Sequence, residues 1–559
     1  MRKLAMANPH KNKHLVTCAL PYANGAIHIG HLLEYIQADI WVRYWRLRGV
    51  ETLFFCADDT HGTPIMIRAR AEGISPEALI ERTWYEHVAD FAAFGIRFDH
   101  YHSTHSRENR DLATEIFQRL QEHGHVVSRE VDLAFCPVDE MFLPDRYIKG
   151  TCPYCGTPDQ YGDSCDHCAR TYTPRDLPNP VCAQCGWKPD WIPSTHLFLR
   201  VSNFEPALRD WLNAGHVQEQ VVNLLAEWFR AGLRDWDISR DAPYFGFEIP
   251  GYPGKYFYVW LDAPVGYMAT VLAWCREHGR EFTEVWQNGE YRIVHFIGKD
   301  IVYFHALFWP ALLMGSGFRT PDELAVHGFL TVNGQKMSKS RGTFLTARTY
   351  LNHLDPQYLR FYYAAKLGPR LDDLDLQLDE FVQRVNADLV NTIVNIPSRV
   401  IPLLHRYGGG RLGTMDGEGR ALVEAIQARC ETIGDLYEQR EFSQVVRTLV
   451  RLASDINVYL HQQEPWRAGA TDPVRAISAC TAALNAFKCV ALVLQPVLPH
   501  LSAEVARMMG VEEFTWADID VVLEEHPIAP FTRLMERVDP RRVEAMVATS
   551  APDDEPPLS

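Results

Sequence analysis

The sequence predicts a mixed α/β protein in which a parallel-sheet domain carries a cysteine-rich insertion and is followed by a helical bundle. Three observations lead to this fold class. Strand-like and helix-like segments alternate near the N-terminus, seven of the 13 cysteines lie between Cys136 and Cys185, and strand patterns fade after about Asp355. The chain has 559 residues, of which 47% are hydrophobic. This length is enough for about three to four domains.

The N-terminal segment predicts a βαβ unit. Residues 15–19 are apolar and lead into a turn that contains Pro and Gly, which is typical of a buried strand. Apolar residues then recur at helical spacing over residues 31–48, and a second strand-like run follows at residues 52–56. This order fits an open, Rossmann-like parallel sheet, in which ligands bind at the carboxyl ends of the strands.

Two later apolar runs, residues 293–297 and 324–329, predict the remaining parallel strands. Lys299 and Asp300 follow the first run directly, and a loop that contains lysines follows the second. Because parallel strands end at one edge of the sheet, we expect these polar groups to lie at its ligand-binding edge.

The C-terminal part predicts an antiparallel helix bundle, because its long segments have helical periodicity. These segments are residues 380–404, 418–437, 443–461 and 473–492. We expect the first half of the α/β domain at 1–121, the insertion at 122–240, the second half of the α/β domain at 241–354, the helical domain at 355–545 and a disordered, acidic and Pro-rich tail at 546–559.

Composition narrows the class of protein. The net charge of -16 argues against a protein that coats nucleic acid through a global positive field, although a local basic groove remains compatible with it. Uncharged apolar stretches are shorter than the ~18 residues of a membrane-spanning helix, and residues 1–13 do not resemble a secretion signal. We therefore expect a cytoplasmic protein with no membrane partner. In that compartment, clustered cysteines indicate metal binding rather than disulfides.

Two short motifs indicate a polyphosphate site. His28 and His31 flank Gly30 where the first strand gives way to a helix, and the N–H groups of a helix N-terminus attract phosphate. Lys336 and Lys339 lie on a polar loop and can neutralise charge that develops on a polyphosphate. Taken singly, the histidines are ordinary capping residues and the lysines an ordinary solvated charge run. Their joint presence in one α/β domain favours the site.

These motifs resemble the HIGH and KMSKS motifs of class I aminoacyl-tRNA synthetases, and both are unaltered in this chain. The resemblance implies that His28 and His31 stabilise the α-phosphate of ATP, bound with Mg²⁺, while an amino-acid carboxylate attacks it. It also implies that Lys336 and Lys339 hold the leaving pyrophosphate on a mobile loop. Arg240 is expected to pair with an acidic neighbour and to steady the loop. The remaining residues of the implied ATP site are Gly30, Lys299, Asp300, Ser338 and Ser340.

Within that family, residues 17–25, 56–62, 258–264 and 295–305 are similar to the bacterial members that use methionine. The resemblance implies ATP-dependent activation of L-methionine to an adenylate. Transfer to the 3′-terminal adenosine of initiator and elongator methionine tRNA would follow, with release of AMP and pyrophosphate. The insertion is too short for the large editing domain of the leucine, isoleucine and valine enzymes. Many relatives carry a further dimer-forming domain, so we expect this chain to be a monomer, as a natural short form or a truncated one.

A pocket for methionine needs soft, apolar walls, because the thioether is polarizable and a weak acceptor. A Tyr hydroxyl and a His N–H can bond weakly to the sulfur, and Asp59 is expected to anchor the α-ammonium group. Aromatic residues are equally usual in plain cores, so this second interpretation stays open. The expected walls are Leu20, Tyr22, Trp260, Ala263, Pro264, Tyr267, Ile301 and His305.

The insertion predicts one metal site and allows a second. Two Cys-x-x-Cys pairs, with Cys152 and Cys155 in one and Cys165 and Cys168 in the other, are typical of a structural Cys₄ Zn²⁺ site. A second set is incomplete, because Asp139 stands where a fourth cysteine is expected. Its members, Cys136, Asp139, Cys182 and Cys185, form either a weaker Cys₃Asp site or an empty remnant, with His196 as a less favoured ligand.

The helical domain carries polar residues on one helical face. Asn391, Asn395 and Arg399 recur every four residues, and Trp466 ends another predicted helix. On composition alone this is a solvated face and a core tryptophan. The resemblance implies that Asn395, Arg399 and Trp466 read the methionine anticodon CAU, by base-edge contacts and stacking.

Two other functional classes remain open for the whole chain. One is a nucleotidyltransferase that does not act on RNA, against which the long helical part argues. The other is a non-catalytic RNA-binding relative, against which the intact histidine and lysine motifs argue.

Overall fold

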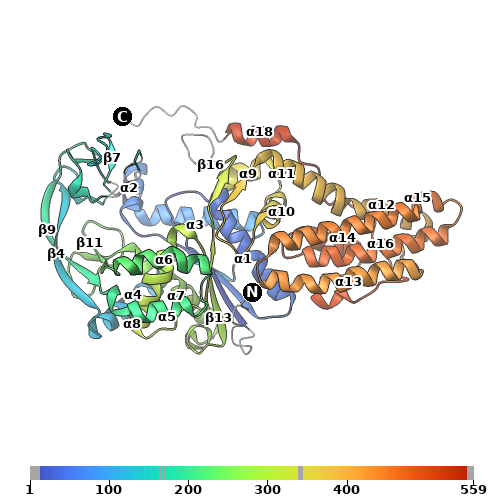
Figure 1. Cartoon of the computed structure of the whole chain (residues 1–559), viewed down its shortest axis with the longest axis horizontal. Coiled ribbons are helices and arrows are strands. Elements are labelled where there is room, and N and C mark those ends of the chain that lie inside the picture. Colours follow the sequence, from blue (N-terminus) through green and yellow to red (C-terminus); the bar gives the residue numbers. More distant parts are fainter. Residues whose placement is uncertain are drawn as a thin grey trace.

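The computed structural model describes residues 13–144, 147–162, 165, 167–168, 170, 172–337 and 344–549. Figure 1 shows a parallel sheet with its helices in the middle, an arm built on β4 and β9 at one end, and a helix bundle at the other. Ser338, Lys339 and Ser340 of the lysine motif and residues 550–559 of the expected tail lie outside the described residues.

A parallel sheet forms the centre of the first domain, and its strand order among the described residues is β14-β13-β1-β2-β3. Strands at all four positions expected from the sequence are confirmed, and β3 is an edge strand that the sequence did not indicate. The strands are β1 (Lys13–Cys18), β2 (Thr52–Asp58), β3 (His100–Ser103), β13 (Tyr291–Gly298) and β14 (Glu323–His327).

Side chains alternate across this sheet, so each face packs against its own layer of helices. On one face, Val16 of β1 packs under α1 (Ile29–Leu47) in a core that continues into the helix bundle. On the other face, Leu15 packs in a second core with α7 (Val259–His278) and α8 (Trp309–Ser316). Burial on both faces explains why the strand sequences are continuous apolar runs rather than alternating ones.

The insertion forms an antiparallel arm. Strands β4 (Val126–Cys136) and β9 (Asp190–Leu199) pair along their length (Figure 1). The short strand β10 (Trp236–Asp237) pairs with β9. A small sheet carries cysteines at the outer end of the arm; it consists of β6 (Ile148–Gly150), β7 (Gln160–Tyr161) and β8 (Val181–Cys182). The helices beside the sheet and arm are α2 (Thr63–Glu72), α3 (Pro76–Ala93), α4 (Arg107–Glu122), α5 (Glu205–Asn213) and α6 (Glu219–Ala231).

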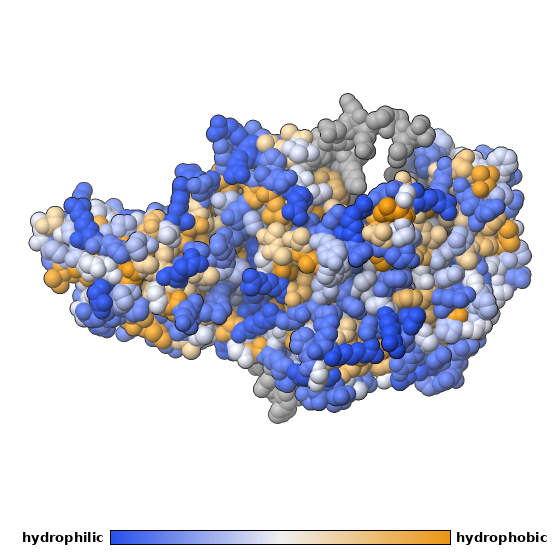
Figure 2. Space-filling view, turned by 180° about the vertical axis from the view of Figure 1, so that it is seen from behind, coloured by the Kyte–Doolittle hydropathy of each residue, from blue (hydrophilic) through white to orange (hydrophobic). Residues whose placement is uncertain are grey.

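The bundle follows the sequence expectation closely. Helix α16 (Pro473–Leu494) lies in its middle and contacts α12, α13 and α14. It is long and apolar enough to cross a membrane, but 94% of its apolar window is buried in the bundle, as expected of a core helix. The face in Figure 2 shows apolar residues scattered among hydrophilic ones over the bundle. The helices around α16 are α10 (Pro356–Lys366), α11 (Leu378–Arg384), α12 (Asn395–Gly408), α13 (Gly417–Glu438), α14 (Phe442–Gln463) and α17 (Pro499–Met508).

Two details differ from the sequence expectation. The segment expected as one helix at 380–404 is interrupted, because residues Val385–Val394 between α11 and α12 form a π-helix. The expected disordered tail begins too early, because α18 (Pro540–Thr549) extends through its first residues and buries Val543 and Met546. Apolar side chains at helical spacing, which the acidic composition of the last residues masks, account for this second difference.

A buried ion pair joins the two domains. Arg360 of α10 is 1% exposed, and its guanidinium donates to Asp39 of α1 at 2.7 Å and to the carbonyl oxygens of Val497, Pro496 and Phe94. A buried charge is tolerated only when it is paired and hydrogen-bonded in this way. The parallel sheet and the bundle therefore share one packed boundary.

Candidate functional site

A cavity of about 1200 Å³ opens at the carboxyl edge of the parallel sheet. Its wall includes Ala19 after β1, Asp59 after β2, Gly298 at the end of β13, and Gly328 after β14. This is the edge at which open α/β sheets bind ligands.

The two motif histidines cap helix α1 reciprocally. His28 is the N-cap, its Nδ1 accepts from the backbone N–H of His31 at 3.2 Å, and Nδ1 of His31 accepts from the N–H of His28 at 3.4 Å. Their rings stack with centroids 3.5 Å apart. Burial lowers the pKa of His28 to about 4 and that of His31 well below its ordinary value. Both rings are therefore neutral, and since Nδ1 accepts, the proton sits on Nε2, from which it can be donated to a ligand.

The start of the lysine loop lies beside the histidines. A Cβ at Gly30 would meet the methyl group of Met337, and both residues line the cavity. Lys336 contributes its backbone to β16 (Gln335–Lys336), which pairs with β15 (Leu330–Val332). The two motifs, about 300 residues apart in the chain as their numbers show, are thus brought together at one wall.

Every residue expected around methionine lines the cavity: Leu20, Tyr22, Asp59, Trp260, Ala263, Pro264, Tyr267, Ile301 and His305. Nδ1 of His305 is 3.0 Å from the carbonyl oxygen of Ile301, so it carries the proton. Burial lowers the pKa of His305 to about 4, and its neutral ring accepts at Nε2 from the Tyr267 hydroxyl at 2.8 Å. The donors expected for a sulfur contact are therefore engaged with each other and with the backbone in this structure.

Asp59 carries a buried carboxylate oxygen that could bind a cation. Among the described residues, its Oδ1 has no hydrogen-bond partner. Burial, together with the nearby charges of Asp262 and Asp58, raises the pKa of Asp59 well above its ordinary value. A bound ammonium group would reverse this effect, because an opposite charge favours the ionised carboxylate.

Of the two residues expected to contact ribose and phosphate, one lines the cavity and the other does not. Asp300 lines the cavity, as expected. Lys299 is not among the described residues that line it; its ammonium forms an ion pair with Asp373 and lies 4.4 Å from the ring centroid of Phe329. Lys299 follows strand β13, as the sequence predicts, but its ammonium group pairs with an acidic residue far along the chain.

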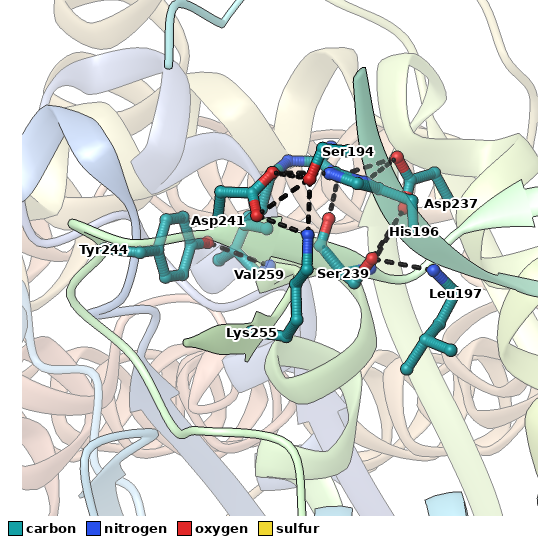
Figure 3. Close-up of polar contacts among 10 residues, drawn as sticks. Ser194, His196, Leu197, Asp237, Ser239, Asp241, Tyr244, Lys255 and Val259 are labelled. Carbon is teal, nitrogen blue, oxygen red and sulfur yellow. Dashed lines mark hydrogen bonds and ion pairs between the residues drawn. The ribbon is translucent and has the colours of Figure 1, made fainter. Parts of the chain in front are cut away.

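Arg240 lies in the cavity wall with the acidic neighbour expected for it. Its Nη1 is 3.4 Å from Asp237 and donates to the carbonyl oxygen of Ser239 at 2.6 Å. The guanidinium also lies 3.7 Å from the ring centroid of Tyr258. Figure 3 shows that Asp237 and the neighbouring Asp241 are both bonded to His196. Both ring nitrogens of His196 are thereby occupied, so the histidine is not a ligand of the second cysteine set.

Sequence reasoning missed a buried acid–base pair in the wall. Glu34 of α1 accepts from the Ala19 N–H at 2.6 Å and lies 3.1 Å from Nε2 of His327. Burial raises the pKa of Glu34. Burial lowers the pKa of His327, but the hydrogen bond and charge of Glu34 outweigh burial, so the pKa of His327 is raised overall. A glutamate within an apolar helical pattern was the one available signal, since Lys and Glu are seldom buried without a partner.

Both cysteine sets converge at the outer end of the arm, and within each set the ligand atoms lie within 4.8 Å of one another. In the first set, the Sγ atoms of Cys152 and Cys168 are 3.7 Å apart and those of Cys155 and Cys165 are 3.5 Å apart. Thiolates about 2.3 Å from one zinc ion would be separated by about 3.8 Å. In the second set, one oxygen of Asp139 lies 3.1 Å from the Sγ atoms of both Cys136 and Cys182, so the carboxylate occupies the fourth corner.

The polar face of the bundle gathers two of its expected residues. Arg399 of α12 lies 4.8 Å from the ring centroid of Trp466 in α15 (Pro465–Ala468) and donates to Asn457 at 3.0 Å. Trp466 is 37% exposed, so it is a surface platform rather than a core residue. Asn395 begins α12, and its side-chain oxygen accepts from Ser398 at 3.1 Å.

The chain matches two protein families along nearly its whole length. The family of class I tRNA synthetases (M) covers residues 14–401, and the anticodon binding domain of methionyl tRNA ligase covers residues 409–530. The methionine–tRNA ligase of Thiobacillus denitrificans is 51% identical over 547 residues, which is 97% of this chain and 79% of that protein.

Two solved structures share the fold. Mycobacterium tuberculosis methionyl-tRNA synthetase in complex with methionyl-adenylate superposes with a TM-score of 0.78 at 23% identity, over 94% of this chain and 100% of that one. The apo form from the same organism gives a TM-score of 0.72 at 21% identity, over 95% of this chain and 99% of that one.

Proposed function

The chain belongs to the class I methionyl-tRNA synthetases, and from that premise we propose how its residues divide the work of the reaction. The enzyme is a methionine–tRNA ligase, which activates methionine with ATP and esterifies tRNA. One observation carries the assignment of the site: neutral histidine donors and a buried carboxylate, one oxygen of which has no hydrogen-bond partner among the described residues, face the same cavity at the carboxyl edge of the sheet.

The adenylation step relies on charge stabilisation and positioning. The methionine carboxylate attacks the α-phosphate in line, and pyrophosphate leaves. The Nε2–H groups of His28 and His31, at the positive end of α1, donate to the phosphate oxygens as their charge grows. Lys336 and Lys339 neutralise the leaving pyrophosphate. Mg²⁺, when bound with ATP, screens the polyphosphate charge.

Methionine is held by charge at one end and by shape at the other. Asp59 accepts the α-ammonium group, and the aromatic and aliphatic wall with Trp260 and Tyr267 surrounds the thioether. Shape alone separates side chains that differ by one methylene-sized group by only ~1–3 kcal/mol. Discrimination against leucine therefore needs the Tyr267–His305 pair to turn a donor towards the sulfur when methionine binds.

The Cys₄ set holds a structural Zn²⁺, and the Cys₃Asp set holds a second, weaker one. Four thiolates leave no open position for catalysis, so the first ion maintains the outer end of the arm. Metal analysis of the purified chain should give more than one zinc per protein. Asp139→Ala should remove the weaker zinc, whereas Asp159→Ala, an exposed carboxylate nearby, should retain it. An unchanged zinc content in Asp139→Ala would refute the second site.

The bundle reads the anticodon. The exposed Trp466 offers a stacking surface and Arg399 beside it a cation, with Asn395 one turn away on the same helix. Initiator and elongator methionine tRNA share the anticodon CAU, so this surface serves both. The chain acts as a monomer in the cytoplasm.

ATP–pyrophosphate exchange without tRNA tests the proposal. Methionine should support exchange, while leucine, isoleucine, valine and cysteine should not. Lys339→Ala should largely abolish exchange, with Lys366→Ala as a control outside the loop. Exchange with a different amino acid would overturn the pocket, and normal exchange in Lys339→Ala would overturn the role of the loop.

A further inference from the structure

A polar network in the cavity wall links the insertion to the catalytic site (Figure 3). His196 comes from β9 of the arm, whereas Asp237, Arg240 and Asp241 come from β10 and β11 (Ser239–Asp241). All four residues line the cavity. Lys255 of β12 (Lys255–Phe257) completes the network by an ion pair with Asp241.

His196 must be protonated to make the contacts it makes. Its Nδ1 is 2.7 Å from Asp237 and its Nε2 is 2.8 Å from Asp241, and ionised carboxylates only accept hydrogen bonds. The residue is 1% exposed. Burial lowers its pKa, but the bonds and charges of both carboxylates outweigh burial and raise the pKa above the ordinary value. Burial raises the pKa of Asp241, but the hydrogen bonds from His196, Lys255 and Ser194 outweigh burial and depress that pKa to about 2.

Each carboxylate also holds a second group. Asp237 accepts from the backbone N–H and hydroxyl of Ser239 at 3.1 and 3.2 Å and lies 3.4 Å from Arg240. Asp241 accepts from the Ser194 hydroxyl at 2.9 Å. With His196 protonated, three cations face two carboxylates, so the network carries one net positive charge. With His196 neutral, the charges of Arg240 and Lys255 are cancelled by the two carboxylates.

We propose that His196 is a positioning residue, through which the insertion offsets the charge of Asp237 and thereby weakens the ion pair of Asp237 with Arg240, so that the guanidinium can act on the polyphosphate of ATP. This inference rests on the proposed ATP site. Without the imidazolium, Asp241 still pairs with Lys255, but Arg240 is the cation of the network that is left to pair with Asp237. The guanidinium is then drawn towards its own neighbour and the wall loses its positive charge.

Other charged groups around His196 leave this balance intact. Arg129 is its cross-strand partner on β4, and the guanidinium of Arg129 pairs with Asp235 at the surface. The groups that set the protonation of His196 are therefore Asp237, Asp241, Lys255 and Arg240. As pH rises through the raised pKa of His196, the proton is lost and affinity for ATP should fall.

The test compares charge variants in methionine-dependent ATP–pyrophosphate exchange. His196→Gln should raise the KM for ATP by about 10-fold, as for coupled members of one network, with little change in the KM for methionine. The double variant His196→Gln with Asp237→Asn restores one net positive charge and should recover most of the loss. A merely structural role for His196 would give no such rescue. His125→Gln, which replaces another histidine of the arm, is the matched control.

A pH profile separates the possible outcomes. The wild type should lose affinity for ATP on the alkaline side, and His196→Gln should show a flatter profile. A His196→Gln enzyme with wild-type KM for ATP and a wild-type profile would overturn the inference while the proposed function stands. Absence of methionine-dependent exchange in the wild type would instead refute the proposed function. If His196→Gln loses activity because it unfolds, thermal unfolding will detect this, and the double variant will not recover the wild-type KM for ATP.

Discussion

Asp59→Asn should separate methionine binding from folding stability. The substitution keeps the shape of the side chain and removes its charge. In the absence of ligand, one Asp59 oxygen is buried and has no partner among the described residues, and Asp262 and Asp58 repel its ionised form. The negative charge of Asp59 therefore destabilises the free protein and stabilises the complex with methionine.

The expected loss of binding follows from the burial of the pair. Removing one partner of a buried, hydrogen-bonded charge pair costs about 2–5 kcal/mol. Since about 1.4 kcal/mol is a factor of ten, the Kd for methionine should rise about 30-fold to several thousand-fold. The KM for ATP should change little, because the histidine and lysine motifs are untouched.

Stability should move in the opposite direction. The folded-state pKa of Asp59 is raised by burial and by Asp262, so its stabilising contribution is complete below the ordinary pKa of about 4 and is lost as pH rises through the raised value. Asparagine does not titrate. The Tm of Asp59→Asn relative to wild type should therefore increase as the pH rises from about 4.

Calorimetry and thermal unfolding check both halves of this prediction. Asp90→Asn is the matched control, because Asp90 is also buried with a raised pKa but pairs with Arg348 away from the cavity. The control should retain its affinity for methionine. A Kd within about threefold of wild type for Asp59→Asn, far below the 2 kcal/mol bound, would refute the assignment of the ammonium site.

Three further predictions concern the other parts of the chain. Cys155→Ser should lose the Cys₄ zinc and expose the arm to proteolysis, because a structural zinc site contributes folding energy; metal analysis and limited digestion check this. Trp466→Ala should raise the KM for tRNA by about 5- to 160-fold, the equivalent of about 1–3 kcal/mol of lost stacking, without changing pyrophosphate exchange. Arg360→Ala should lower the free energy of unfolding by about 3–5 kcal/mol in urea titration, because three buried carbonyl oxygens lose their donor at about 1–3 kcal/mol each, while Asp39 keeps its ion pair with Arg43; a loss below about 1 kcal/mol would contradict this.

Much of the fold could be predicted because local patterns and global packing agree. Residues 15–19 are mostly apolar and have little alternation because β1 is buried on both faces, and the helical spacing of residues 473–492 recurs in α16 at the centre of the bundle. The Cys-x-x-Cys pairs correctly predicted that Cys152 and Cys165 belong to one cluster, because two such pairs at this spacing are typical of a zinc site.

The missing parts of the site depend on partners far apart in the sequence. Lys299 lies at the expected strand end, yet its ammonium group pairs with Asp373. His196 was considered only as a metal ligand, because its two carboxylates lie about 40 residues further on, as the numbering shows, and no spacing rule connects them. Burial and charge pairing of this kind depend on tertiary contacts, to which a local pattern is blind.

The arm offers a final test of how far its metal end influences the catalytic wall. Strands β4 and β9 pair continuously from Val126–Leu199 to Phe135–Asp190, so His196 lies near the inner end of the ladder and the cysteines lie beyond the outer end. Local unfolding at one end of a paired ladder need not spread when the other end is buried in a separate core. Cys155→Ser should therefore retain the wild-type KM for ATP despite its lost zinc. A KM that rises to the value of His196→Gln would instead mean that the zinc holds the whole ladder, and with it the charge balance at Arg240.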